Sequence, residues 1–223
     1  MGNWERYVWN QREALWAGLQ ITIELCLVAF VCALAGGLLL ALIRLYVRPL
    51  KPLAIVLTEF FRATPILVQL LWVAYVWPDL FGWPATFHGA AVVALALQSS
   101  GYLAETFRGA IEAIPRGHIE AADSLGIAPW RRFLRIVLPQ VLIHAAPSFG
   151  NQFTVIVKSS TLVSVISVTD LMFQSQKILN QSLEPIEILT ATAVIYITFI
   201  FLISTANKAL ADGLRRRYGW VNP

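Results

Sequence analysis

Several stretches of this chain run for about twenty residues without a charged side chain, which is the length that a helix needs to cross a lipid bilayer. They include residues 25–43, 136–157 and 188–206. The whole chain shares this bias, since 57% of its 223 residues are hydrophobic and 13% are charged, whereas about a quarter are charged in a soluble protein. The sequence therefore predicts an all-α, polytopic membrane protein.

Five spans can be assigned, and together they form a single transmembrane domain over residues 1–223. The second span contains Pro65, which lacks a backbone N–H and is expected to kink its helix. The long connection between the last two spans is predicted to fold back against the bundle, because its apolar run is too short to cross. The predicted spans are residues 19–45, 55–77, 90–108, 136–157 and 188–207.

Basic residues are unevenly distributed between the two sides of these spans. One side carries Arg44, Arg48, Lys51, Arg108, Arg116, Arg131, Arg132, Arg135, Lys208, Arg215, Arg216 and Arg217. The other side carries Arg6, Arg12, Lys158 and Lys177. Because cytoplasmic loops are enriched in Lys and Arg, this asymmetry predicts an N-terminus outside and a C-terminus in the cytoplasm. It also explains the net charge of +4 without a nucleic-acid partner.

A polar stretch, residues 115–139, interrupts the apolar runs on the predicted cytoplasmic side. Pro115 suits the first turn of a helix and Gly126 suits its end, so a short helix is predicted over residues 116–126. Glu120 lies near its start, where a carboxylate is favoured by the unpaired backbone N–H groups. The two alanines that follow are small enough to let another surface approach closely.

This stretch resembles the signature loop of the membrane subunits of bacterial ABC importers, which reads EAA, three residues, G, nine residues and I-x-L-P. Every spacing is kept here, and the matching residues are Glu120, Ala121, Ala122, Gly126, Ile136, Leu138 and Pro139. The resemblance implies that the helix docks in a groove on a separate ATPase subunit. The alternative is an amphipathic connector that lies on the membrane surface.

A wider resemblance, over most of the chain, is to permeases of the polar amino acid uptake family. It rests on residues 61–70 (FRATPILVQL), 102–126, 138–140 and 150–171. Three positions depart from the family pattern: Ala63 stands for Gly, His118 for Gln, and KSST for the usual KDTSL.

This resemblance implies the type I ABC importer permease fold in the bacterial inner membrane. The solute would be a polar amino acid or a similar small zwitterion, delivered by a periplasmic or lipid-anchored substrate-binding protein. The partners would be two ATPase subunits, which hold ATP and Mg²⁺, and a second permease that is either identical or a sister chain.

Polar residues at membrane depth are the candidates for a solute path, since intramembrane polar groups are functional by default. They are Gln98, Ser99, Ser100, Tyr102, Glu105, Asn151, Gln152, Lys158, Ser159, Ser160 and Thr161. The alternative for each is a hydrogen bond between helices, worth about 0.6 kcal/mol. Glu105 and Lys158 offer both charges that a zwitterion needs, although Glu105 is also expected to pair with Arg108 on the same helix face.

Two other classes of protein fit the sequence less well. A secondary transporter driven by an ion gradient favours inverted repeats, and five spans without an internal repeat do not divide into equal halves. A membrane-embedded enzyme needs a nucleophile or metal cluster, but the histidines and cysteines have no ligand spacing; they are His88, His118, His144, Cys26 and Cys32. No catalytic or metal-binding residue is therefore predicted. The sequence also contains no G-x-x-x-x-G-K-[ST] phosphate-binding loop, so ATP hydrolysis is expected on a partner.

Overall fold

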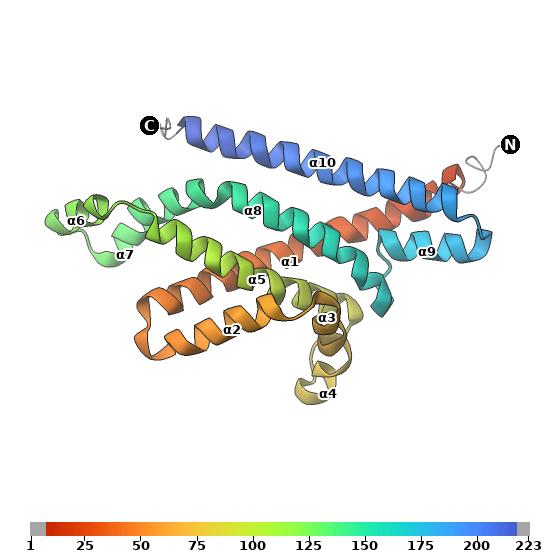
Figure 1. Cartoon of the computed structure of the whole chain (residues 1–223), viewed down its shortest axis with the longest axis horizontal. Helices are drawn as coiled ribbons and strands as arrows, with labels where there is room; N and C mark the ends of the chain where they lie inside the picture. Colours follow the sequence, from red (N-terminus) through yellow and green to blue (C-terminus); the bar gives the residue numbers. More distant parts are fainter. Residues whose placement is uncertain (1–7, 218–223) are drawn as a thin grey trace.

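The computed structural model describes the backbone of residues 8–217 and the side chains of residues 8–213 (Figure 1). This range is helical and contains no β-strand, which confirms the all-α prediction. The α-helices are α1 (Arg12–Tyr46), α2 (Lys51–Ala63), α3 (Ile66–Tyr75), α4 (Trp77–Phe81), α5 (Phe87–Glu112), α6 (Arg116–Ser124), α7 (Pro129–Arg132), α8 (Leu138–Ser160), α9 (Leu171–Ser182) and α10 (Pro185–Arg217). Shorter helical turns are η2 (Arg48–Leu50), the π-helix η3 (Phe133–Val137) and η4 (Thr161–Ile166). Arg6 and both ends of the predicted 1–223 domain lie outside the described residues.

Three stretches within residues 8–217 are long and apolar enough to cross a membrane, namely Arg12–Tyr46, Pro129–Ile166 and Pro185–Gly213. The pair Arg48–Ala63 and Ile66–Tyr75 makes a fourth if the two helices count as one span. α5 has 26 residues, or about 39 Å at 1.5 Å per residue, but its second half is too polar for it to join this group. The membrane-helix architecture is thus confirmed, and the number of five spans stays a prediction.

The second predicted span differs from expectation, because α2 and α3 meet at 106° rather than as one kinked helix. Thr64 and Pro65 are both extended, with ψ of 126° and 132°. A proline disfavours the helical conformation in the residue before it, and here Pro65 is extended as well. Two consecutive extended residues turn the chain instead of bending a continuous helix.

α5 is the central helix of the bundle and packs against α1, α2, α3 and α8. Small residues bring these helices close together. A Cβ on Gly37 of α1 would lie 2.7 Å from the Leu103 Cβ of α5, and a Cβ on Gly101 of α5 would lie 3.0 Å from the Thr58 carbonyl oxygen of α2. Backbone contact at such positions is how membrane helices gain van der Waals energy without a hydrophobic driving force.

The two ends of the bundle differ in what they carry (Figure 1). α6 and α7 lie at one end, together with the C-terminal ends of α1, α5 and α10. The start of α1 and the whole of α9 lie at the other end. At that end the backbone N–H of Leu171 donates to the Thr22 hydroxyl at 3.1 Å, which fixes the 158–187 connection against α1. The predicted folding back of this connection is confirmed.

Candidate functional site

α6 is the predicted short helix, and its end is built by a glycine. The Gly126 N–H donates to the Asp123 carbonyl at 3.0 Å, and the Ile127 N–H donates to the Ala122 carbonyl at 3.1 Å. This pair of bonds is a Schellman motif, which needs a left-handed residue at its centre. Gly126 supplies that residue with φ of +65°. The sequence signal that placed a helix stop here therefore has a defined structural cause.

Two side-chain contacts tie α6 to its neighbours. Asp123 forms an ion pair with Arg132 of α7, and the His118 Nδ1 lies 3.0 Å from the Gln140 Oε1 of α8. The short helix α6 is therefore linked to α7 and to α8 by separate contacts. The His118–Gln140 contact was not expected from the sequence, although both positions lie inside the stretches that carry the family resemblance.

The docking residues predicted from the signature divide into two groups. Glu120, Ala121 and Gly126 are exposed, whereas the Ala122 side chain is buried and holds α6 in place. Ile136, Leu138 and Pro139 are half-buried where η3 continues into α8. Leu125, a large apolar side chain next to the exposed group, is 78% exposed. The exposed surface of α6 therefore combines the acidic side chain of Glu120 with the apolar side chain of Leu125.

The polar residues of α5 and α8 meet at one buried contact. The Gln152 Nε2 donates to the Ser99 hydroxyl at 3.2 Å, and both side chains are buried. Ser100 is buried where α5 passes Gly36 of α1, and its hydroxyl donates to the Leu97 carbonyl at 2.7 Å. Ser160 is fully buried and likewise donates to its own helix. These side chains are buried within the chain, and each makes a hydrogen bond to a neighbouring group of α5 or α8.

Gln98 and Tyr102 lie at the break between α2 and α3. The Gln98 Nε2 is 3.5 Å from the Thr64 carbonyl, and the Tyr102 hydroxyl is 3.4 Å from the Arg62 carbonyl. The break between α2 and α3 interrupts the helical hydrogen bonding at both carbonyls, so side chains of α5 act as the donors instead. The Arg62 guanidinium also lies over the Tyr102 ring, 5.5 Å from its centroid. Non-helical backbone within a membrane is tolerated where protein buries it or where it lines a water-filled cavity.

Glu105 is part of an ionic cluster between α1 and α5. It pairs with Arg44 near the end of α1 and with Arg108 at 2.7 Å, and Arg108 reaches Glu112 at 2.5 Å. The expected Glu105–Arg108 pair is therefore confirmed. The Arg44 partner was missed, because it is 61 residues away in the chain. Two arginines already balance the charge of Glu105 in this structure.

Lys158 is not brought together with Glu105. It lies in the last turn of α8, just before the connection that contacts Thr22 near the start of α1. Glu105 instead pairs with Arg44 and Arg108, whereas Lys158 faces α10. The two charges proposed for one zwitterion therefore belong to different contacts in this structure.

Lys158 and Asn151 instead line a cavity of about 560 Å³ between α8 and α10. Lys208 and Asp212 of α10 contribute to the same cavity. Next to it, Ser159 is half-buried, and the Thr161 hydroxyl donates to the Lys158 carbonyl at 2.8 Å, which continues α8 into η4. Asn151 and Lys158 are thus predicted path residues that face a sizeable polar space.

Asp170 is a buried acid that the sequence reasoning did not select. Its Oδ1 accepts the Phe173 N–H at 2.9 Å and so caps the start of α9. Burial raises the pKa of Asp170 to about 6, because a charged carboxylate is costly away from water. The available signal was its position directly before a helical apolar run, where an N-cap is expected. Among the described residues, no group of three potential metal ligands occurs.

A bundle of long apolar helices is the architecture of an integral membrane protein, and α6 is exposed at one end of this bundle. The comparisons with known proteins agree. The chain belongs to the family described as binding-protein-dependent transport system inner membrane component, whose match covers residues 33–216. It is thus a permease subunit of an ABC importer, in which ATP hydrolysis resides on a separate subunit.

Its relatives include a probable amino-acid permease, YxeN of Bacillus subtilis strain 168, which is 34% identical over 90% of this chain and 91% of that protein. The glutamine transport system permease GlnP of Escherichia coli strain K12 is 34% identical over 86% and 91%. The crystal structure of an amino acid ABC transporter with histidines matches with a TM-score of 0.81 and 32% identity, over 91% of this chain and 95% of that one. The MetNI methionine transporter, at 20% identity and a TM-score of 0.75 over 96% and 99%, shares the fold.

Proposed function

We propose that this permease imports a polar amino acid or a similar small zwitterion, using force that an ATPase applies to α6. The observation that carries the proposal is the construction of α6. It is an exposed helix, closed by a Schellman turn and linked by separate contacts to α7 and α8. Such a helix can pass a rigid-body displacement into the spans. The substrate class rests on the relatives, which include glutamine and arginine permeases.

The proposed assembly contains two such permeases, identical or paired with a sister chain, and two ATPases that bind ATP and Mg²⁺. An extracytoplasmic binding protein delivers the solute, and α6 lies on the cytoplasmic side of the inner membrane. α6 lies at the same end of the bundle as the basic C-terminal ends of α1 and α10 (Figure 1), which supports this orientation. The N-terminus of the chain is then outside.

Substitution of Gly126 tests the docking role of α6. Gly126→Val places a β-branched residue at φ of +65°, which strains the turn, so substrate-stimulated ATPase activity and uptake are expected to fall together. Gly82→Val is a matched control, because Gly82 has φ of +68° and also no neighbour within 4 Å of an added Cβ. Gly82 lies at the end of α4, away from α6. Equal losses in both variants would show that strain alone is responsible and would contradict docking.

A charge reversal at the exposed Glu120 supplies an independent test. Glu120→Lys is expected to reduce ATPase binding and uptake while the thermal stability of the permease stays unchanged, since Glu120 is exposed. Unaltered ATPase stimulation in this variant would remove Glu120 from the docking surface.

The solute path is tested in proteoliposomes that contain the permease, its ATPase and its binding protein. Radiolabelled glutamine and arginine identify the transported class. Lys158→Met is expected to lower uptake, because Lys158 faces the polar cavity between α8 and α10. Lys177→Met removes an exposed charge from α9 and serves as the control. Normal uptake by Lys158→Met would exclude this cavity from the path.

A further inference from the structure

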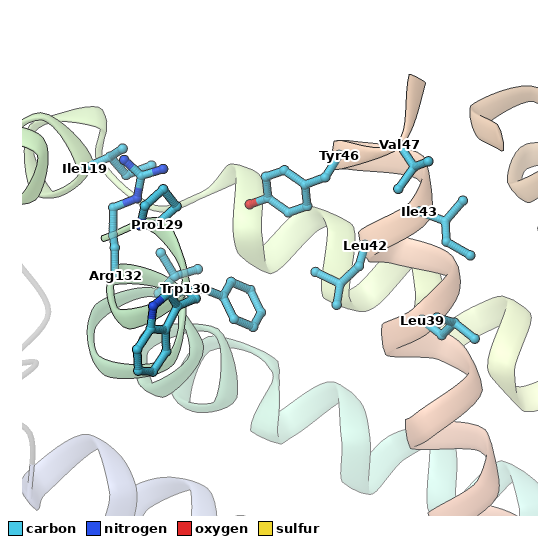
Figure 2. Close-up of a pocket in the computed structure, with 11 residues that line it drawn as sticks. Leu39, Leu42, Ile43, Tyr46, Val47, Ile119, Pro129, Trp130 and Arg132 are labelled. Atoms are coloured by element: carbon cyan, nitrogen blue, oxygen red, sulfur yellow. The ribbon is translucent and has the colours of Figure 1, made fainter. Parts of the chain in front are cut away.

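An apolar groove of about 540 Å³ lies between the end of α1 and the segment that follows α6 (Figure 2). The α1 wall contributes an apolar row and one tyrosine, and the opposite wall comes from α6, α7 and η3. The lining residues are Leu39, Leu42, Ile43, Tyr46, Val47, Ile119, Pro129, Trp130, Arg132, Phe133 and Val137. Figure 2 shows Tyr46 reaching from α1 toward Pro129 and Ile119 at one end of the groove.

The lining residues change in character along α1, from aromatic at the end of the helix to aliphatic further inside. Leu39 and Tyr46 are seven residues apart on α1, about 10 Å along the helix, and α1 is one of the helices able to cross a membrane. Tyr46 and Trp130 are both 61% exposed, and such aromatic side chains favour the headgroup level. Leu39 is 59% exposed and lies on the hydrocarbon side of them. The Leu39 end of the groove therefore suits an acyl chain.

Uncompensated positive charge lies next to residues that line the groove. The Arg131 guanidinium stacks on Trp130, 5.1 Å from the ring centroid, and has no acidic partner among residues 8–213. The same holds for Arg48, which directly follows the lining residue Val47. Arg132, in contrast, is paired with Asp123. Two arginines without an acidic partner in this range, Arg131 and Arg48, are thus neighbours of lining residues, while the arginine in the lining itself is neutralised.

We propose that this groove binds an anionic phospholipid, with an acyl chain along Leu39 and Ile43 and the phosphate beside Arg131. The apolar lining and the neighbouring unpaired arginines match the two parts of such a lipid, and basic pockets between membrane helices bind anionic headgroups. The bound lipid would fill the space between α1 and the α6–α7 segment. It would thereby hold α6, the proposed docking helix, more rigidly against α1, and this role goes beyond the proposed transport function.

Lipid retention tests the proposal without any transport measurement. The full permease complex is reconstituted in nanodiscs of phosphatidylcholine with 20% phosphatidylglycerol, re-extracted in mild detergent, and its retained lipids are quantified by mass spectrometry. We expect phosphatidylglycerol to be enriched over the bulk ratio. Arg131→Gln should weaken the preference for phosphatidylglycerol over phosphatidylcholine about fivefold, which corresponds to about 1 kcal/mol for one basic residue near an anionic lipid.

Leu39→Trp should abolish the enrichment by occupying the groove. Leu202→Trp is the matched control, since Leu202 of α10 is 60% exposed and does not line the groove. The proposal is overturned if phosphatidylglycerol is not enriched, or if both groove variants retain it as the wild type does. It is also overturned if permease without ATPase shows the enrichment and the assembled complex loses it, because the groove would then belong to the ATPase. None of these results depends on solute uptake.

Discussion

Replacing Gly37 with alanine probes how closely α1 and α5 pack. The added Cβ would lie 2.7 Å from the Leu103 Cβ and 3.0 Å from the Ala104 nitrogen. Ordinary van der Waals contact begins at 3.4 Å, so one helix must move by roughly 0.7 Å or the added methyl must be accommodated by strain. The second atom belongs to the backbone, so no side-chain rotation can relieve that contact.

The expected cost follows from two opposing effects. Overpacking a well-packed interface costs about 1–3 kcal/mol, whereas alanine is favoured over glycine in a helix by about 1 kcal/mol. Gly109→Ala is the matched control, because Gly109 is also helical and an added Cβ there meets no atom within 4 Å. The control gains the helix preference alone. The two variants should therefore differ in stability by about 1–3 kcal/mol.

The assay is thermal unfolding of the two purified variants in the same detergent, followed by the fluorescence of the eight tryptophans. A difference of 1 kcal/mol shifts Tm by about 2–4 °C in a chain of this size, so Gly37→Ala should unfold about 2–12 °C below Gly109→Ala. Gly36→Ala, whose Cβ would lie 3.1 Å from the Ser100 Cβ, should fall between them. If Gly37→Ala were as stable as Gly109→Ala, the close approach of α1 and α5 would be wrong.

Two further predictions concern acidic groups. Burial raises the pKa of Asp170 to about 6, so the folded state holds its proton more tightly than the unfolded state and stability falls as the pH rises from about 4 to 6. Asp170→Asn keeps an N-cap and should flatten this dependence in melting curves recorded at pH 4.5 and 7; an unchanged pH profile would refute the assignment. Glu105→Gln leaves two arginines facing each other and should destabilise the permease by about 1–2 kcal/mol. Glu112→Gln, which removes a more exposed carboxylate, should cost less, and the reverse order of melting temperatures would contradict the cluster.

The candidate site was partly accessible from the sequence. The α6 helix was predicted because Pro115 and Gly126 act through their own backbone geometry, and that effect is local. The polar residues of α5 and α8 were also identified by type. The sequence did not predict which of these residues lie together. Gln98 contacts the Thr64 carbonyl at the α2–α3 break, Gln152 donates to Ser99, and Lys158 faces α10. Which residues become neighbours depends on helix rotation and crossing, which composition does not encode.

The sequence by itself determined that this chain is helical and resides in a membrane. A bilayer offers backbone groups no hydrogen-bond partner, so an apolar run of sufficient length must form a helix. The tertiary structure alone decided that Arg44 neutralises Glu105 across 61 residues, and that α2 and α3 turn by 106°. It also decided that α1 and η3 enclose an apolar groove. These features arise from packing between distant segments, where contact energies, rather than local preferences, select the arrangement.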